Sequence, residues 1–322
     1  MAKKRWYLYN KNKIPDMKIF HFSFLFSLFS LIGLSSDART VQKQSEKSLL
    51  WQISGNGLEK PSYIYGTIHL LCEEDAILSD SLIRAIENTE RVYMEVDLDN
   101  LFELFGAMRQ MKMRNDTTLK DLLTAEEYIQ VKKFIESKNT MLPFSVLETY
   151  KPLLASSTLF ESGLPCSTPV AMEQIIMKEA KLRGKRIEGL ETMSYQLSIF
   201  DSIPYKVQAE QLLKYTSSDG DMSEADKEFT QMMDAYKEQD LEKLDAFIRK
   251  SENGMGEYEN ILLFNRNRNW VKKLKIILQE RTVTIAVGAG HLPGEKGLIG
   301  LLRKEGYTVK PVKNIVAKKN VI

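Results

Sequence analysis

The sequence predicts an α/β fold in which two strand–helix–strand units, one at each end of the mature chain, join in a single sheet. In each unit an apolar strand runs directly into Gly-x-x-His-Leu: "YIYGTIHLL" at residues 63–71 and "TIAVGAGHL" at residues 284–292. Between the units, from about residue 100 to 281, apolar residues recur every three or four positions, which is typical of helices. We therefore expect one sheet interrupted by a large helical insertion.

The first unit starts with a predicted β-hairpin. "LLWQIS" (49–54) and "SYIYGTI" (62–68) are rich in β-branched and aromatic residues, and a Gly/Asn/Pro cluster separates them. "SDSLIRAIENTE" (79–90) predicts a helix that opens at a Ser or Asp cap, and "RVYMEVDL" (91–98) predicts a short strand.

The second unit repeats this order. A strand ends in a glycine-rich turn that carries His291, and we expect a helix from Gly297 to Lys304 and a strand from Tyr307 to Val312. The Gly-x-x-His-Leu falls at the same place in both units, which indicates a weak internal duplication. Within the insertion, "KRIEGLE" (185–191) predicts one further short strand.

The N-terminus has the form of a secretory signal peptide. Residues 1–38 contain a basic stretch, an apolar run and small residues near the end, and Met17 could be the true start. We expect a linker at 39–47, the folded domain at 48–313 and a basic tail at 314–322. The protein would then be exported, periplasmic or extracellular; an uncleaved N-terminal membrane anchor is the alternative and the sole membrane contact expected.

Composition limits the possible partners. The 322 residues include 45 Lys and Arg against 43 Asp and Glu, a net charge of +2 that gives no reason to expect nucleic-acid binding. The cysteines, Cys72 and Cys166, could pair in an exported protein, although sequence cannot show that they are close. Cys72 lies three residues after His69, so a role as a metal ligand is also considered.

The predicted site lies at the carboxyl ends of the strands, where ligands bind in α/β sheets. His69, His291 and an acid after the intervening strand, Glu95 or Asp97, would all project there. Two neutral imidazoles and a carboxylate form a common ligand set for a catalytic divalent ion. The same residues could instead form a metal-free acid–base site, or each histidine could be structural.

Two other stretches contain candidate site residues. "LFNRNRNWVKKL" crowds two Arg-Asn pairs into one helical turn: Arg266, Asn267, Arg268 and Asn269. Such a pair could stabilise an oxyanion or could be a solvated helix face. In "GLETMSYQL", Glu191 and Gln196 could orient the site, or Glu191 could cap a helix.

The chain resembles the TraB/PrgY/GumN family, which is related to the Tiki metalloproteases. The resemblance covers about residues 48–313. It is carried, in order, by "WQISGNGLEKPSYIYGTIHL", "VYMEVDL", "GLETMSYQL", "NRNRNW" and "VGAGHLPGEKGLIGLLRKEGYTVKPV". The resemblance implies a Tiki-like and EreA/ChaN-like fold of two halves, each with a GxxH motif.

The resemblance also implies site roles. His69 and His291 match the two motif histidines and Glu95 the acid after the first, together holding a divalent metal, with manganese or cobalt favoured and zinc possible. Arg266 and Asn267 best match the family's Arg-Asn pair, and the shifted register would use Arg268 and Asn269. The family commonly has Gly-Leu/Val-Asp at residues 171–173, where this chain has Ala-Met-Glu; this departure puts a role for the acid, Glu173, in doubt.

We therefore expect an exported hydrolase, a metal-dependent peptidase that acts on a peptide or protein. A metal-free esterase or amidase with a histidine base is one alternative. A non-enzymatic protein that sequesters a peptide signal is the other. The sequence leaves the substrate and the oligomeric state open.

Overall fold

The structure is a computed structural model. It divides between Gln44 and Ser45, and all described residues lie in the unit Ser45–Ile322. The described residues are 47–138, 140, 142–162, 166, 168–216, 224–250 and 258–316. The predicted signal peptide, nearly all of the linker and most of the basic tail lie outside them. Among the described residues, no helix has both the length and the apolar character needed to span a membrane.

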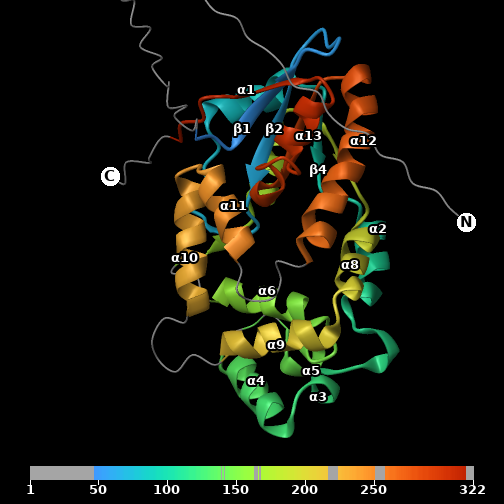
Figure 1. Ribbon diagram of the computed structural model, residues 1–322, viewed down its shortest axis with the longest axis vertical. Helices are drawn as coiled ribbons and strands as arrows, with labels where there is room; N and C mark the ends of the chain where they lie inside the picture. Colours follow the sequence, from blue (N-terminus) through green and yellow to red (C-terminus); the bar gives the residue numbers. More distant parts are fainter. Residues whose placement is uncertain are drawn as a thin grey trace, which may run out of the picture. The chain divides into compact units, whose positions relative to one another are not determined.

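A six-stranded mixed sheet forms the centre of the unit (Figure 1). Its strand order is β6-β4-β7-β2-β1-β8. The strands are β1 (Leu50–Ser54), β2 (Ser62–Thr67), β4 (Arg91–Met94), β6 (Arg186–Gly189), β7 (Val283–Gly288) and β8 (Thr308–Pro311). Strands β6, β4, β7 and β2 are parallel, and β1 is antiparallel to both β2 and β8. The predicted β1–β2 hairpin and the strand in "KRIEGLE" are confirmed.

The two predicted end units are interleaved in this sheet. Strands β2 and β4 of the first unit do not pair with each other but lie on either side of β7 from the second. Strands β7 and β8 of the second unit are separated by β2 and β1. Neither unit therefore has a pair of hydrogen-bonded strands from its own βαβ segment, which differs from two halves set side by side.

The helices of the end units form where the sequence places their caps and apolar stripes. Helix α1 (Asp80–Asn88) starts after Ser79, whose side chain accepts a hydrogen bond from Leu82 N. Its residues Leu82, Ala85 and Ile86 are buried, three and four positions apart. Helix α13 (Leu298–Lys304) follows β7 within one residue of the predicted bounds.

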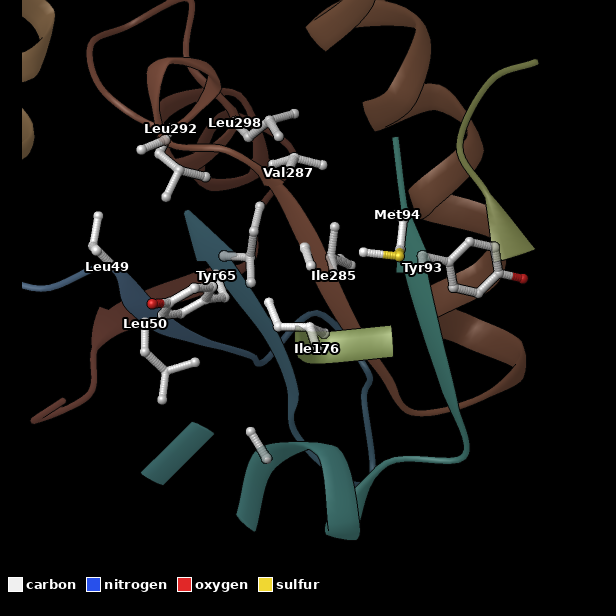
Figure 2. Packing of buried hydrophobic residues seen from close by; sticks show 14 of the residues in the cluster. Leu49, Leu50, Tyr65, Tyr93, Met94, Ile176, Ile285, Val287, Leu292 and Leu298 are labelled. Carbon is white, nitrogen blue, oxygen red and sulfur yellow. The ribbon is translucent and has the colours of Figure 1, made fainter. Parts of the chain in front are cut away.

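The main hydrophobic core surrounds the sheet. Figure 2 shows Tyr65, Ile285 and Tyr93 on neighbouring strands, with Ile176 beside Ile285. Ile176 belongs to α7 (Met172–Leu182), and Trp270, from α12 (Asn265–Glu280), lies in the same core. The stretch 100–281 is mostly helical as expected, yet it returns to the sheet through α7, β6 and α12.

The remaining helices are α2 (Leu101–Ala107), α3 (Leu119–Leu122), α4 (Ala125–Ser137), α5 (Phe144–Leu147), α6 (Pro152–Ser162), α8 (Met193–Ile199), α9 (Tyr205–Thr216), α10 (Glu224–Lys237) and α11 (Leu241–Lys250). Helices α3, α4, α5, α6 and α9 gather around a second hydrophobic cluster (Figure 1). Val131, Leu159 and Leu212 are among its fully buried members. Part of the insertion therefore has a core of its own.

A disulfide joins Cys72 and Cys166, with 5.8 Å between their Cα atoms. It lies beside a two-stranded sheet formed by β3 (Leu71–Cys72) and β5 (Pro169–Val170). The pairing left open by the sequence is present. Because the Cys72 sulfur is bonded to Cys166, this thiol is not available as a metal ligand.

Candidate functional site

The register of the parallel strands brings the predicted residues to one edge of the sheet. Thr67 at the end of β2 lies opposite Gly288 at the end of β7, and Met94 at the end of β4 pairs with Ala286. His69, Glu95 and His291 follow these strand ends within three residues. The two histidines, far apart in the sequence, thus come from adjacent strands.

The glycines of the two motifs allow this close approach. A Cβ atom at Gly66 would lie 3.0 Å from the Cα atom of Ala289, inside the second motif. A Cβ atom at Gly288 would lie 3.2 Å from Glu95 Oε1. A side chain at either position would therefore separate the two motifs or displace the carboxylate between them.

Glu95 is buried, and protein groups bind both of its carboxylate oxygens. Oε1 accepts a hydrogen bond from Gly288 N at 2.8 Å. Oε2 accepts from Gln196 Nε2 at 2.8 Å and from Arg266 Nη2 at 2.5 Å. Burial would raise the pKa of Glu95, but His291, Arg266 and the Gly288 N–H outweigh it and lower that pKa to about 2. Glu95 is therefore a carboxylate at neutral pH.

Arg266 is the central cation of the site, and all its polar hydrogens face protein acceptors. Nε and Nη2 donate to Glu191 Oε1 at 2.9 and 2.6 Å, and Nη2 also donates to Glu95. Nη1 donates to the carbonyl of Leu262 at 3.0 Å and lies 3.1 Å from His291 Nε2. An oxyanion contact by Arg266, as predicted from the sequence, would require one of these bonds to be exchanged.

Glu191 supports the guanidinium from the other side. Its Oε2 accepts a hydrogen bond from Trp270 Nε1 at 2.9 Å, and the Arg266 guanidinium lies 4.7 Å from the centre of the Trp270 ring. Burial raises the pKa of Glu191, and the Arg266 contacts offset only part of this. The cap of α8 is Thr192, so Glu191 holds the Arg266 side chain rather than capping that helix.

Asn267 fixes the ring of His291. The amide Nδ2 of Asn267 donates to the carbonyls of His291 at 3.3 Å and Lys296 at 3.0 Å, so Oδ1 must be the atom that faces the ring. His291 Nδ1 lies 2.6 Å from this oxygen and therefore carries the proton, which leaves the lone pair on Nε2. Burial lowers the pKa of His291 to about 3, so the ring is neutral at pH 7.

His69 has the opposite surroundings, because its side chain is 72% exposed. Its Nδ1 lies 2.8 Å from Oε1 of the buried Glu173, and the same oxygen accepts from Thr67 Oγ1 at 2.6 Å. The hydrogen bond to Glu173 raises the pKa of His69 to about 9. When the ring is neutral, Nδ1 again holds the proton, and no hydrogen-bond partner of Nε2 is found among the described residues.

The structure separates the alternatives that the sequence left open. Arg266 and Asn267 are buried in the site, whereas Arg268 and Asn269 are exposed. Glu95 occupies the site, whereas Asp97 accepts a hydrogen bond from Asp99 N in the following turn. Three residues were not singled out as site residues from the sequence: Thr67, Trp270 and, as a partner of His69, Glu173.

Some features of these side chains suit a divalent metal ion and others oppose one. Each motif histidine has Nδ1 held by an oxygen acceptor, Glu173 or Asn267, which is the usual arrangement of a histidine that offers Nε2 to a metal. Two carboxylates, Glu95 and Glu191, face the Arg266 guanidinium, and Glu173 Oε2 is buried without a hydrogen-bond partner among the described residues. Those residues contain no gathered group of three His, Cys, Asp or Glu ligands, and an ion at His291 Nε2 would have to displace Arg266.

The chain is a member of the TraB/PrgY/gumN family, whose sequence profile matches residues 49–311. Metalloprotease TIKI1 of Danio rerio is 24% identical over 86% of this chain and 66% of that protein. Metalloprotease TIKI1 of Homo sapiens is 21% identical over 83% and 63%. The Metalloprotease TIKI homolog of Amphimedon queenslandica is 22% identical over 82% and 61%.

The chain thus spans just under two thirds of the length of these relatives. No solved structure matches it.

Proposed function

We propose that the protein is a hydrolase that cleaves a peptide bond in a peptide or protein substrate, at the site formed by His69, Glu95 and His291. The observation that carries the proposal is a pair of imidazoles at adjacent strand ends. In each ring an oxygen acceptor binds Nδ1, which leaves Nε2 as the nitrogen that could bind a metal ion or exchange a proton. The names of the relatives, which are metalloproteases, support the same class of reaction.

His69, Glu95 and His291 would hold a divalent ion, with manganese or cobalt favoured and zinc possible. When bound, such an ion would act as a Lewis acid toward the substrate carbonyl and the attacking water. The chain's own residues prepare this site: Asn267 keeps the proton of His291 on Nδ1, and Arg266 keeps Glu95 ionised and in place.

His69 is the motif histidine that a substrate can approach, because its side chain is exposed. With Nδ1 on Glu173 and a pKa of about 9, the ring is protonated at neutral pH, so Nε2 can donate a proton to a leaving amine and can accept one from water after that proton is lost. Arg266 and Asn267 are the proposed catalytic partners. A contact of Arg266 with the developing oxyanion would exchange for its bond to the Leu262 carbonyl, the one neutral acceptor besides His291.

A metal-free esterase or amidase is the second candidate, and one observation favours it. Arg266 Nη1 already lies at His291 Nε2, and protein groups bind both oxygens of Glu95. In this version His69, once it has lost its Nε2 proton, is the base, and Arg266 is the cation bound to Glu95. EDTA discriminates the two candidates, because it should abolish the metal-dependent activity and leave the metal-free one unchanged.

The test combines elemental analysis with a peptide-cleavage screen on the purified chain. We expect about one divalent ion per chain after supply of manganese, cobalt or zinc, and cleavage that falls at least 100-fold in His69→Ala and in His291→Ala. Arg268→Ala, exposed on α12, is the control and should keep both properties. Folded histidine variants with unchanged cleavage and metal content would contradict the site. Stoichiometric peptide binding without turnover would indicate a sequestering protein instead.

We also propose that the protein is exported to the periplasm or the extracellular space. The Cys72–Cys166 disulfide supports this, because such bonds persist in oxidising compartments. Mass spectrometry after thiol alkylation tests it: the exported protein should carry no alkyl group on either cysteine, and alkylation of both in protein isolated from its native compartment would contradict export.

A further inference from the structure

We propose that Glu173 is a positioning residue that holds the imidazole of His69 with Nε2 directed to the substrate side of the site. This inference rests on the proposed function, since it assigns a role in the same hydrolytic site. It assigns a role to a buried acid that was neither among the predicted metal ligands nor among the predicted catalytic residues.

The backbone fixes Glu173 next to His69. Glu173 is the second residue of α7, and the first, Met172, donates its N–H to the carbonyl of Ile68 at 3.2 Å. The start of the helix is thus tied to the residue directly before His69. Met172 and Ile176 anchor α7 in the main core, so this tie is rigid.

Two donors converge on one oxygen of Glu173. Thr67 Oγ1 lies 2.6 Å from Oε1, and His69 Nδ1 lies 2.8 Å from the same atom. Thr67 ends β2 and His69 follows two residues later, so the carboxylate spans the turn that leads out of the strand. Because the His69 side chain is otherwise exposed, this contact sets the orientation of its ring.

Folding alone does not account for this carboxylate. Glu173 is 8% exposed, and its Oε2 has no hydrogen-bond partner within the described part of the chain. A buried carboxylate with one unsatisfied oxygen costs stability, and such features are found chiefly where function requires them. An apolar residue at position 173 would extend the buried face formed by Met172, Ile176 and Ala180.

The comparison with His291 supports the assignment. There, the oxygen of Asn267 holds Nδ1 and leaves the lone pair on Nε2. When the His69 ring is neutral, Glu173 gives it the same tautomer from a different helix and with a different functional group. The two rings thus share one tautomer although α7 supports one and α12 the other.

Glu173→Met tests the proposal, because it removes the acceptor and keeps the length of the side chain. The measurement is a long-range ¹H–¹⁵N correlation spectrum of the imidazole nitrogens at about pH 10, above the pKa of about 9 at which His69 loses its charge. In the native chain we expect the Nδ1–H tautomer at His69, and in Glu173→Met we expect mostly the Nε2–H tautomer preferred in water. The His291 signals should not change.

Two further variants separate positioning from a structural role. Glu173→Gln keeps an oxygen acceptor and should keep the native tautomer, with activity between native and Glu173→Met. Glu179→Met removes an acid from the same helix that pairs with Arg183, outside the site, and should leave tautomer and activity unchanged. For Glu173→Met we expect a 10- to 100-fold loss in kcat, as found for residues that orient site histidines, with little change in KM.

An Nδ1–H tautomer at His69 in folded Glu173→Met would overturn the proposal. A loss of activity in Glu173→Gln as large as in Glu173→Met, with both tautomers native, would also overturn it. If the tautomer switches as expected but no variant or native chain hydrolyses any peptide, the positioning holds and the proposed function is the part that fails.

Discussion

The two Gly-x-x-His-Leu motifs begin alike and end in different surroundings. Both follow a central strand, and both histidines have Nδ1 against an oxygen. His291 is buried between Asn267, Arg266 and Trp270, whereas His69 is largely exposed and held only by Glu173. A repeated motif therefore fixes where a histidine emerges, while elements outside the repeat decide its exposure and charge.

The surroundings differ because different helices reach the two strand ends. Helix α12 brings an amide and a guanidinium to His291, and α7 brings a carboxylate to His69. Their electrostatic effects are opposite: burial lowers the pKa of His291 to about 3, and Glu173 raises the pKa of His69 to about 9. One ring is built to stay neutral, and the other can take up and release a proton.

The largest expected effect concerns the cation on the buried side. Arg266→Met leaves Glu95 and Glu191 buried without their shared guanidinium. Removing one partner of a buried ion pair costs about 3–5 kcal/mol, so the free energy of unfolding in urea should fall by that amount. Arg268→Met, on the exposed face two residues later, should change it by less than about 0.5 kcal/mol. Equal losses in both variants would show that Arg266 is not the buried cation of the site.

A smaller effect is expected from the amide that holds His291. Asn267→Leu leaves three groups without their partner: the buried ring N–H and carbonyl of His291, and the partly buried carbonyl of Lys296. An unsatisfied buried polar group costs about 1–3 kcal/mol, and we expect a loss in this range for the whole change because the groups can partly re-pair. Asn269→Leu is the exposed control. A native melting curve for Asn267→Leu would contradict the locked ring.

The smallest effect is the pH dependence of stability on the exposed side. The pKa of His69 is raised to about 9, so the folded chain binds a proton that the unfolded chain, with a pKa near 6.5, has lost. This contribution is complete below about pH 6.5 and disappears as the pH rises through 9.

Because water screens the exposed His69, the alkaline loss should be below about 1 kcal/mol. In His69→Gln this loss should vanish. The buried His291 acts in the other direction: its pKa of about 3 means that the unfolded chain binds more protons below pH 6.5, so stability falls toward acid. His69→Gln should leave this acid loss in place, and a native alkaline slope in that variant would contradict the Glu173 contact.

Local sequence patterns predicted the helices and strands well where apolar residues follow a clear helical or strand period. The hairpin, the Ser79 cap of α1, and the strand and helix near the C-terminus all follow from alternation, capping and turn residues. The interleaved strand order could not be read this way, because it depends on which strands pair across more than two hundred residues. The Cys72–Cys166 pairing is also non-local, since the two residues are 94 positions apart.

The candidate site could be predicted only in part, because some of its contacts are also non-local. The shared motif pointed to His69 and His291, and the strand end pointed to Glu95. The helical period could have distinguished the two Arg-Asn pairs. Trp270, Val271 and Leu274 lie on the buried face of α12, and the positions one turn before Trp270 and Val271 on that face are Arg266 and Asn267. Glu173 could not be connected to His69, because the contact depends on how α7 packs against the strand end.

The central claim, that the two motif histidines serve one metal-dependent site, is tested most directly by adding Mn²⁺ to the purified, ¹⁵N-histidine-labelled chain. Paramagnetic broadening of the imidazole signals reports which rings lie next to the ion. We expect the His69 and His291 signals to broaden together at up to one equivalent of Mn²⁺, and Glu95→Gln to weaken the effect on both. Broadening of the exposed His69 alone, or of neither ring, would contradict the claim.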